Sequence, residues 1–212
     1  MKINLFSVPI SITSKPQALA TVSQWLTERK KIEGKKQKGE HLLPSSFFLR
    51  IVTTPNPEMI VAAQKDPEFL KALQSADLAI PDGIGIVWAV RSLKPSSFFL
   101  FPSSLERTSG LDLMESLVGE SAKHGWKILL LGGKPGVAEK AAEKLRHQIR
   151  PGLALQGQAF IQSISGPKDI SGISKSDNDR LISRINSYSP DLLFVAFGHG
   201  RQEKWLAVNR NR

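Results

Sequence analysis

Two near-continuous apolar runs, each ending in glycines, constrain the fold of this chain most. Residues 126–131 read WKILLL and run into a glycine pair at 132–133, and residues 190–197 read PDLLFVAF and end in Gly-His-Gly at 198–200. Strands that are apolar throughout are typical of parallel sheets that are covered on both faces. Amphipathic segments alternate with these runs. We therefore predict an α/β fold with a mostly parallel sheet and helices on both faces.

Local signals indicate where the helices lie. Asn56 and Asp66 each precede a Pro-Glu pair, which is typical of an N-cap followed by proline in the first turn, and we predict helices at about 57–64 and 67–75. The amphipathic segments at 111–124 and 137–147 predict two more helices. Further strands are predicted at 47–52 and 78–81, and a short helix contains residues 202–205.

The length of 212 residues and the hydrophobic content of 41% are enough for one sizeable core, so we treat residues 1–212 as a single domain. Two segments are predicted to be loop insertions. Residues 30–44 begin with a lysine-rich run, and residues 96–104 contain SSFFLFPSS. These phenylalanines either dip into a membrane interface or pack on the domain surface. Residues 163–178 are predicted to form a mobile loop.

Composition excludes several classes of site and partner. The chain has no cysteine and only four scattered histidines, which excludes a disulfide framework and a Cys-type zinc site, and we expect no metal and no cofactor. A net charge of +10 favours an anionic partner, either nucleic acid, an anionic membrane surface or a phosphorylated substrate. Because no nucleic-acid-binding motif accompanies the lysine run, we expect no nucleic-acid partner. No run is long enough to span a bilayer, so we expect a cytoplasmic protein.

Candidate site residues follow the predicted strands, because ligands bind at the carboxyl ends of strands in parallel sheets. Thr54 and Asn56 follow one strand, and Asp82 follows another. Asp82 is either the N-cap of the next helix or a carboxylate that accepts a proton from an attacking hydroxyl. Backbone amides of the turn at Gly132 and Gly133 could face a pyrophosphate, although a lone glycine pair is a weak signal.

Two further polar residues have both a functional and an ordinary interpretation. Arg107 is a cation that suits phosphate oxygens, but it could equally form a surface ion pair with Glu106. Gln202 and Glu203 lie at the start of the last predicted helix, where residues of this kind also favour the helix dipole.

Four motifs, in this order, resemble the WecG/TagA/CpsF family of bacterial N-acetylmannosaminyltransferases and their relatives. They are TPNPEMIVAAQKDPEFLKALQSADLAIPDGIGIVWAVR, ERTSGLDLMESL, KILLLGGKPGVAEKAAEKL and PDLLFVAFGHGRQEKW, within residues 50–208. The resemblance implies a Rossmann-like fold and an inverting, metal-independent transfer of N-acetylmannosamine, or a related hexosamine, from a UDP-sugar. The implied acceptor is polyprenyl-diphosphate-linked N-acetylglucosamine, used in teichoic-acid, capsule and other exopolysaccharide biosynthesis.

The resemblance also implies roles for individual residues. Asp82 matches the proposed general base, and Thr54 and Asn56 match a pair at the substrate pocket. Arg107 matches the pocket arginine, and Gln202 matches the glutamine of the family's Q-E-x-W segment.

In the context of the family, the turn at Gly132 and Gly133 would lie against the nucleotide. The chain departs from the family pattern before Gln202, because relatives usually have a proline in a G-x-G-x-P-x-Q-E stretch where this chain reads GHGRQE at 198–203. That departure leaves the geometry of the loop before Gln202 open.

Relatives in the family carry a basic, aromatic C-terminal appendage for membrane docking, which we expect this chain to lack, with weak or no turnover as the consequence. The resemblance implies a peripheral location on the inner face of the cytoplasmic membrane and association into homo-oligomers. Two alternatives stay open. One is a non-catalytic module that binds nucleotide sugars or lipid phosphates, and the other, which rests on charge alone, is a nucleic-acid-binding protein.

Overall fold

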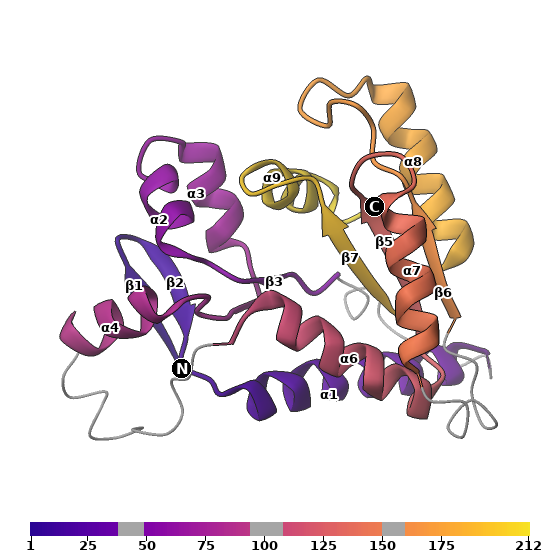
Figure 1. Cartoon of the computed structure of the whole chain (residues 1–212), viewed down its shortest axis with the longest axis horizontal. Helices are drawn as coiled ribbons and strands as arrows, with labels where there is room; N and C mark the ends of the chain where they lie inside the picture. Colours follow the sequence, from indigo (N-terminus) through magenta and orange to yellow (C-terminus); the bar gives the residue numbers. More distant parts are fainter. Residues whose placement is uncertain (38–48, 94–107, 150–159) are drawn as a thin grey trace. The chain divides into compact units, whose positions relative to one another are not determined.

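The computed structural model describes residues 1–37, 49–93, 108–149 and 160–212 (Figure 1). The chain forms two compact units, Met1–Leu113 with Leu206–Asn211, and Met114–Trp205 with Arg212. The single domain predicted from length stays a prediction. The predicted insertion at 96–104 and most of the one at 30–44 lie outside the described residues.

The first unit combines an antiparallel hairpin, a parallel strand pair and several helices. Its elements are β1 (Lys2–Leu5), β2 (Val8–Ser11), α1 (Lys15–Gln37), β3 (Val52–Thr53), α2 (Pro57–Ala63), α3 (Pro67–Gln74), β4 (Leu78–Ala79) and α4 (Ile84–Leu93). β1 pairs with β2, and β3 runs parallel to β4. One core joins the hairpin to α2, α3 and α4 through buried aliphatic side chains and Phe69.

The predicted N-caps of α2 and α3 are confirmed. The Asn56 side chain accepts a hydrogen bond from the Met59 amide at 2.8 Å, and the Asp66 side chain accepts one from the Phe69 amide at 2.9 Å. Each cap satisfies a backbone donor that the first helical turn leaves unpaired. Both helices therefore begin at the prolines from which they were predicted.

The lysine-rich run is helical up to Gln37, so the predicted loop at 30–44 is wrong for residues 30–37. Helix α1 buries Ala18, Val22 and Leu26, four residues apart, on one face. Beyond Leu26 the helix continues mostly through Glu, Arg, Lys and Gln, which have high helix propensity. The Arg29 Nε atom donates to Glu33 Oε1 at 2.8 Å, one turn along. Helix propensity and side-chain pairs of this kind extend a helix without an apolar pattern.

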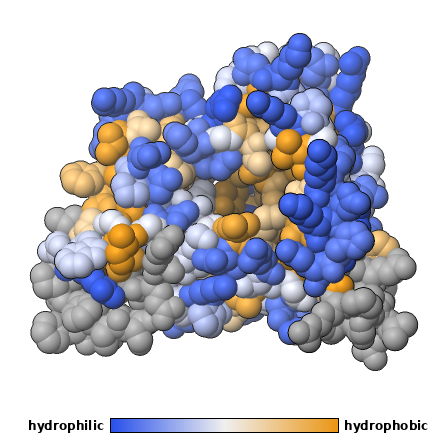
Figure 2. All heavy atoms as spheres, viewed as in Figure 1, coloured by the Kyte–Doolittle hydropathy of each residue, from blue (hydrophilic) through white to orange (hydrophobic). Residues whose placement is uncertain are grey.

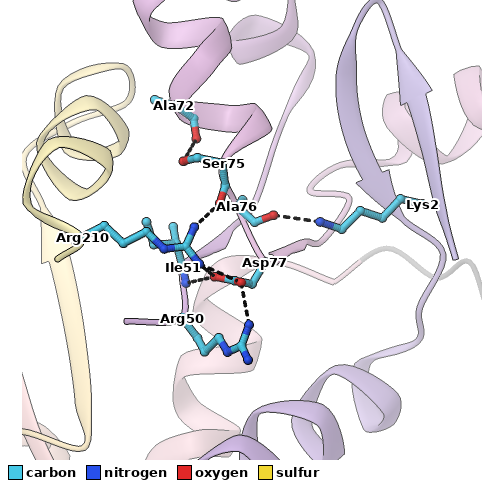
Figure 3. Close-up of polar contacts among 8 residues, drawn as sticks. All are labelled: Lys2, Arg50, Ile51, Ala72, Ser75, Ala76, Asp77 and Arg210. Carbon is cyan, nitrogen blue, oxygen red and sulfur yellow. Dashed lines mark hydrogen bonds and ion pairs between the residues drawn. The ribbon is translucent and has the colours of Figure 1, made fainter. Parts of the chain in front are cut away.

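A charged cluster on Asp77 secures the amino end of the parallel pair (Figure 3). The Asp77 carboxylate accepts hydrogen bonds from the Ile51 amide at 2.8 Å, from Arg50 at 3.0 Å and from Arg210 at 2.7 and 2.9 Å. Arg210 also donates to the Ser75 carbonyl at 2.7 Å. Burial raises the pKa of Asp77, but the hydrogen bonds from Ile51, Arg50 and Arg210 outweigh it and hold the pKa below its ordinary value.

The second unit contains a three-stranded sheet with strand order β6-β5-β7, parallel throughout. Its elements are β5 (Lys127–Gly132), α7 (Val137–Gln148), β6 (Phe160–Ile164), α8 (Lys175–Tyr188) and β7 (Leu192–Ala196). Helices α6 (Gly110–His124) and α9 (Arg201–Asn209) each contain a boundary between the two units. α7 packs on β5 and β6, and hydrophilic residues predominate over its outer surface (Figure 2). The predicted α/β class is confirmed.

The predicted mobile loop at 163–178 is wrong at both ends. β6 extends to Ile164, and α8 begins at Lys175 behind a Ser174 N-cap whose hydroxyl accepts the Asp177 amide at 3.1 Å. Leu181, Ile182 and Ile185 are the buried residues of α8, a narrow apolar stripe in a polar segment. Across the described ranges, we find no helix with the length and apolar character needed to cross a bilayer.

Candidate active site

Two loops meet at the carboxyl end of the parallel pair β3 and β4. Thr53 pairs with Ala79, and beyond this pair the Ile80 amide donates to the Thr53 carbonyl at 2.8 Å. The Asp82 amide donates to the Pro55 carbonyl at 3.0 Å. Pairing thus continues past the strands and holds the loop after β3 beside the loop after β4, as expected for a ligand site in a parallel sheet.

A third segment, which leads into α6, joins these two loops. The Thr108 amide donates to the Pro81 carbonyl at 3.3 Å. Gly110 lies against Thr54, because a Cβ at Gly110 would stand 3.1 Å from Thr54 Oγ1. Ser109 and Asp112 cap the start of α6 reciprocally, at 3.1 and 3.3 Å. The candidate active site therefore consists of three loops of the first unit, fixed by backbone hydrogen bonds.

Asp82 is half-buried, and its carboxylate makes no hydrogen bond or ion pair with any residue in the described ranges. Helix α4 begins two residues later, and the amide of Ile86 is bonded to the Gly83 carbonyl at 3.2 Å. Asp82 is therefore not the N-cap of α4. Gly83 has φ +98°, a conformation that other residues rarely adopt, so the sharp turn after Asp82 needs glycine.

Thr54 and Asn56 lie in the same set of loops as Asp82. Both side chains are half-buried. The Oδ1 atom of Asn56 is occupied by the helix cap, whereas its Nδ2 amide donates to no residue that the structure describes. Asn56 can thus cap α2 with one atom and donate to a ligand with the other. Arg107, the remaining candidate in this part of the chain, lies outside the described residues.

Two threonine hydroxyls at this site, one at the end of β3 and one in the segment before α6, escaped prediction. Thr53 and Thr108 are buried, and their Oγ1 atoms have no hydrogen-bond partner in the described part of the chain. A buried hydroxyl without a partner costs about 1–3 kcal/mol, and such groups are uncommon away from functional sites. No sequence signal distinguishes them, because each threonine is buried by segments that are distant along the chain.

In the second unit, the glycine pair fills a close contact between two strands. Gly132 has φ +121°, and a Cβ there would stand 2.4 Å from the Ala196 carbonyl oxygen. The Gly133 amide donates to that same oxygen at 3.0 Å. A pyrophosphate oxygen would therefore have to compete with the Ala196 carbonyl oxygen for the Gly133 amide. Close packing of β5 against β7 explains the need for glycine at position 132.

Gln202 lies at the start of α9, where a buried carboxylate orients it. The Gln202 Nε2 atom donates to Glu203 Oε1 at 3.0 Å, and the Gly200 amide donates to Glu203 Oε2 at 2.7 Å. Glu203 is buried, whereas Gln202 is half-buried. The bond to Glu203 turns the amide group of Gln202 so that its Oε1 atom is left to accept a hydrogen bond from another group.

The structure brings Thr54, Asn56 and Asp82 together within the first unit. It places Gly132, Gly133 and Gln202 in the second unit, after the carboxyl ends of β5 and β7. Within the described ranges, no three or more His, Asp or Glu side chains are grouped so that they could hold a metal ion.

Comparison with known proteins assigns the chain to a family. Residues 3–212 match the glycosyl transferase WecG/TagA/CpsF family. The N-acetylglucosaminyldiphosphoundecaprenol N-acetyl-beta-D-mannosaminyltransferase of Bacillus subtilis (strain 168) is 28% identical over 159 residues, which cover 74% of this chain. The aligned region spans 53%, or about half, of the length of that relative. This chain belongs to the WecG/TagA/CpsF family of glycosyl transferases.

Proposed function

We propose that this protein is an inverting glycosyltransferase that moves N-acetylmannosamine, or a related hexosamine, from a UDP-sugar to polyprenyl-diphosphate-linked N-acetylglucosamine. The name of the Bacillus subtilis relative supports this donor sugar and this lipid-linked acceptor. The Asp82 carboxylate is the observation on which the proposal depends most. It lies at the carboxyl end of the strand pair, beside Thr54 and Asn56, and has no partner in the described ranges.

The proposed chemistry needs one base and a means of stabilising the leaving group. An acceptor hydroxyl oxygen attacks C1 of the donor sugar from the face opposite the diphosphate, while the C1–O bond to UDP breaks. Asp82 takes the proton of that hydroxyl, and UDP leaves with the bonding electrons. Attack from the opposite face inverts the configuration at C1.

The other predicted residues bind substrates in this proposal. Thr54 and Asn56 hydrogen-bond the sugars through a hydroxyl and an amide. Arg107 offsets the charge that develops on the departing diphosphate, the role that the family resemblance implies for it. Gln202 also binds substrate, the turn at Gly132 and Gly133 lies against the nucleotide, and the resemblance implies that no metal ion takes part.

The lipid acceptor implies where the protein works. A polyprenyl-diphosphate sugar lies at the surface of a membrane, so the enzyme must work at that surface, and we expect a peripheral association with the inner face of the cytoplasmic membrane. The net charge of +10 is consistent with an anionic surface. Association into homo-oligomers is expected from the family resemblance.

Transfer of radiolabelled N-acetylmannosamine from UDP to a short-chain lipid-diphosphate-N-acetylglucosamine tests the proposal. The 212-residue chain is compared with a version extended by the family's C-terminal appendage. Labelled lipid from either version supports the enzyme. UDP binding without lipid product from both versions would contradict it and favour a non-catalytic binding module.

A further inference from the structure

Helix α4 carries apolar side chains on its exposed side as well as on its buried side. Its inner face buries Ile86, Val87 and Val90 in the core of the first unit. On the other side, Ile84 and Trp88 are 57% and 65% exposed. They lie four residues apart and therefore on the same side of the helix. A helix at a protein surface normally presents polar residues to water. Exposed apolar side chains on such a helix therefore indicate a surface that binds a partner.

Arg91 extends the same side of the helix by one turn beyond Trp88, and it is also exposed. We call Ile84, Trp88 and Arg91 the α4 outer face. A tryptophan beside an aliphatic side chain and a cation is the composition of surfaces that enter a membrane interface, because the ring lies among headgroups and the cation meets anionic lipids.

The α4 outer face begins beside the candidate active site. Ile84 is the first residue of α4 and stands two residues after Asp82. A Cβ at Gly85 would stand 3.3 Å from the ring of Pro57, so this end of α4 lies against the first residue of α2, which follows the Asn56 cap. A surface that binds through this face is therefore close to the loops that would receive the acceptor sugar.

We propose that the α4 outer face docks the protein on an anionic lipid bilayer. This inference rests on the proposed function, since an acceptor with a polyprenyl tail is presented at such a bilayer. The apolar side chains of the face enter the interface, while the net charge of +10 provides the attraction to anionic lipids. Docking there holds Asp82 within reach of a headgroup-bound sugar.

Sedimentation with lipid vesicles tests this docking without donor or acceptor sugar. The wild type is expected to bind mixed phosphatidylcholine and phosphatidylglycerol vesicles more tightly than pure phosphatidylcholine vesicles. Trp88→Ser and Ile84→Ser are each expected to weaken binding about tenfold, because each removes one inserted apolar side chain. Both residues are exposed, so the thermal unfolding midpoint should stay close to that of the wild type.

Phe6→Ser is the matched control. Phe6 is an aromatic residue of the same unit with 64% exposure, and it lies at the turn of the β1–β2 hairpin. Its substitution is expected to leave vesicle binding unchanged. Equal vesicle binding by wild type and Trp88→Ser would overturn the proposal, as would an equal loss in Phe6→Ser. Loss of a dimer in Trp88→Ser, with vesicle binding retained, would assign the face to a second copy of the chain instead.

Fluorescence quenching tests whether the ring of Trp88 itself enters the bilayer. Brominated lipids are expected to quench part of the wild-type emission, and Trp88→Phe should keep vesicle binding but lose that quenching. Quenching that persists in Trp88→Phe would overturn insertion of this ring. Both vesicle readouts are independent of sugar transfer, so failure of the proposed enzyme activity and failure of the docking surface are separable.

Discussion

Replacement of Gly132 by alanine should strongly destabilise the second unit. The new Cβ would stand 2.4 Å from the carbonyl oxygen of Ala196 and 2.7 Å from its carbonyl carbon, both in the neighbouring strand β7. Backbone cannot retract as a flexible side chain can, so β7 must move away from β5. That movement stretches the 3.0 Å hydrogen bond from the Gly133 amide to Ala196.

Three contributions set the magnitude. Alanine at φ +121° costs about 1 kcal/mol, the weakened hydrogen bond costs about 1 kcal/mol, and overpacking between the strands costs about 1–3 kcal/mol. The expected loss in the free energy of unfolding is therefore about 3–5 kcal/mol. Gly119→Ala is the control, because Gly119 is in α6 with no atom within 4 Å of the added Cβ, and it should stabilise by up to about 1 kcal/mol.

Equilibrium urea unfolding, followed by tryptophan fluorescence, measures both variants. Trp126 and Trp205 are buried in the second unit, so their emission reports on it. If Gly132→Ala unfolded within 1 kcal/mol of the wild type, the steric explanation would be refuted. The need for glycine at this position would then have to come from a ligand.

Two further predictions concern the charged cluster. Arg210→Ala should lower the free energy of unfolding by about 2 kcal/mol, because it removes a bidentate ion pair whose side chains are 23% and 13% exposed. Arg180→Ala, the control, breaks an exposed 3.4 Å pair with Asp177 and should change the free energy of unfolding by less than about 0.5 kcal/mol. Equal urea midpoints for both variants would contradict this. The lowered pKa of Asp77 adds stability that is complete above its ordinary value of 3.8 and is lost as pH falls through the lower folded-state value. Acid unfolding curves of Arg210→Ala should therefore show a shallower loss of stability below about pH 4 than those of the wild type, and parallel curves would disprove a role for Asp77.

Features encoded by neighbouring residues could be predicted from the sequence. The starts of α2 and α3 depend on Asn56 and Asp66, each followed by Pro-Glu, and both caps form as predicted. The apolar runs at 126–131 and 190–197 predict β5 and β7, which pair in parallel. The central strand β5 is buried after Lys127, whereas the edge strand β7 buries only Leu192. In contrast, α8 has only a narrow apolar stripe in a polar segment, and that pattern also fits a loop.

Features that depend on distant contacts could not be predicted. The partner of the Gly133 amide is Ala196, which is remote in sequence, so the motif alone suggested a free anion-binding amide. Burial of the Thr53 and Thr108 hydroxyls likewise results from loops that meet only in the folded chain. The carboxylate of Asp82 left two interpretations open until the start of α4 at Ile84 excluded an N-cap.

The most direct test of the proposed mechanism compares Asp82→Asn with the wild type in sugar transfer and in UDP binding. Asparagine keeps the shape of the side chain but cannot accept the proton of the attacking hydroxyl. We predict that kcat falls by about 10²- to 10⁴-fold while the Kd for UDP stays within about twofold. Transfer at the wild-type rate by Asp82→Asn would contradict the assignment of Asp82 as the general base.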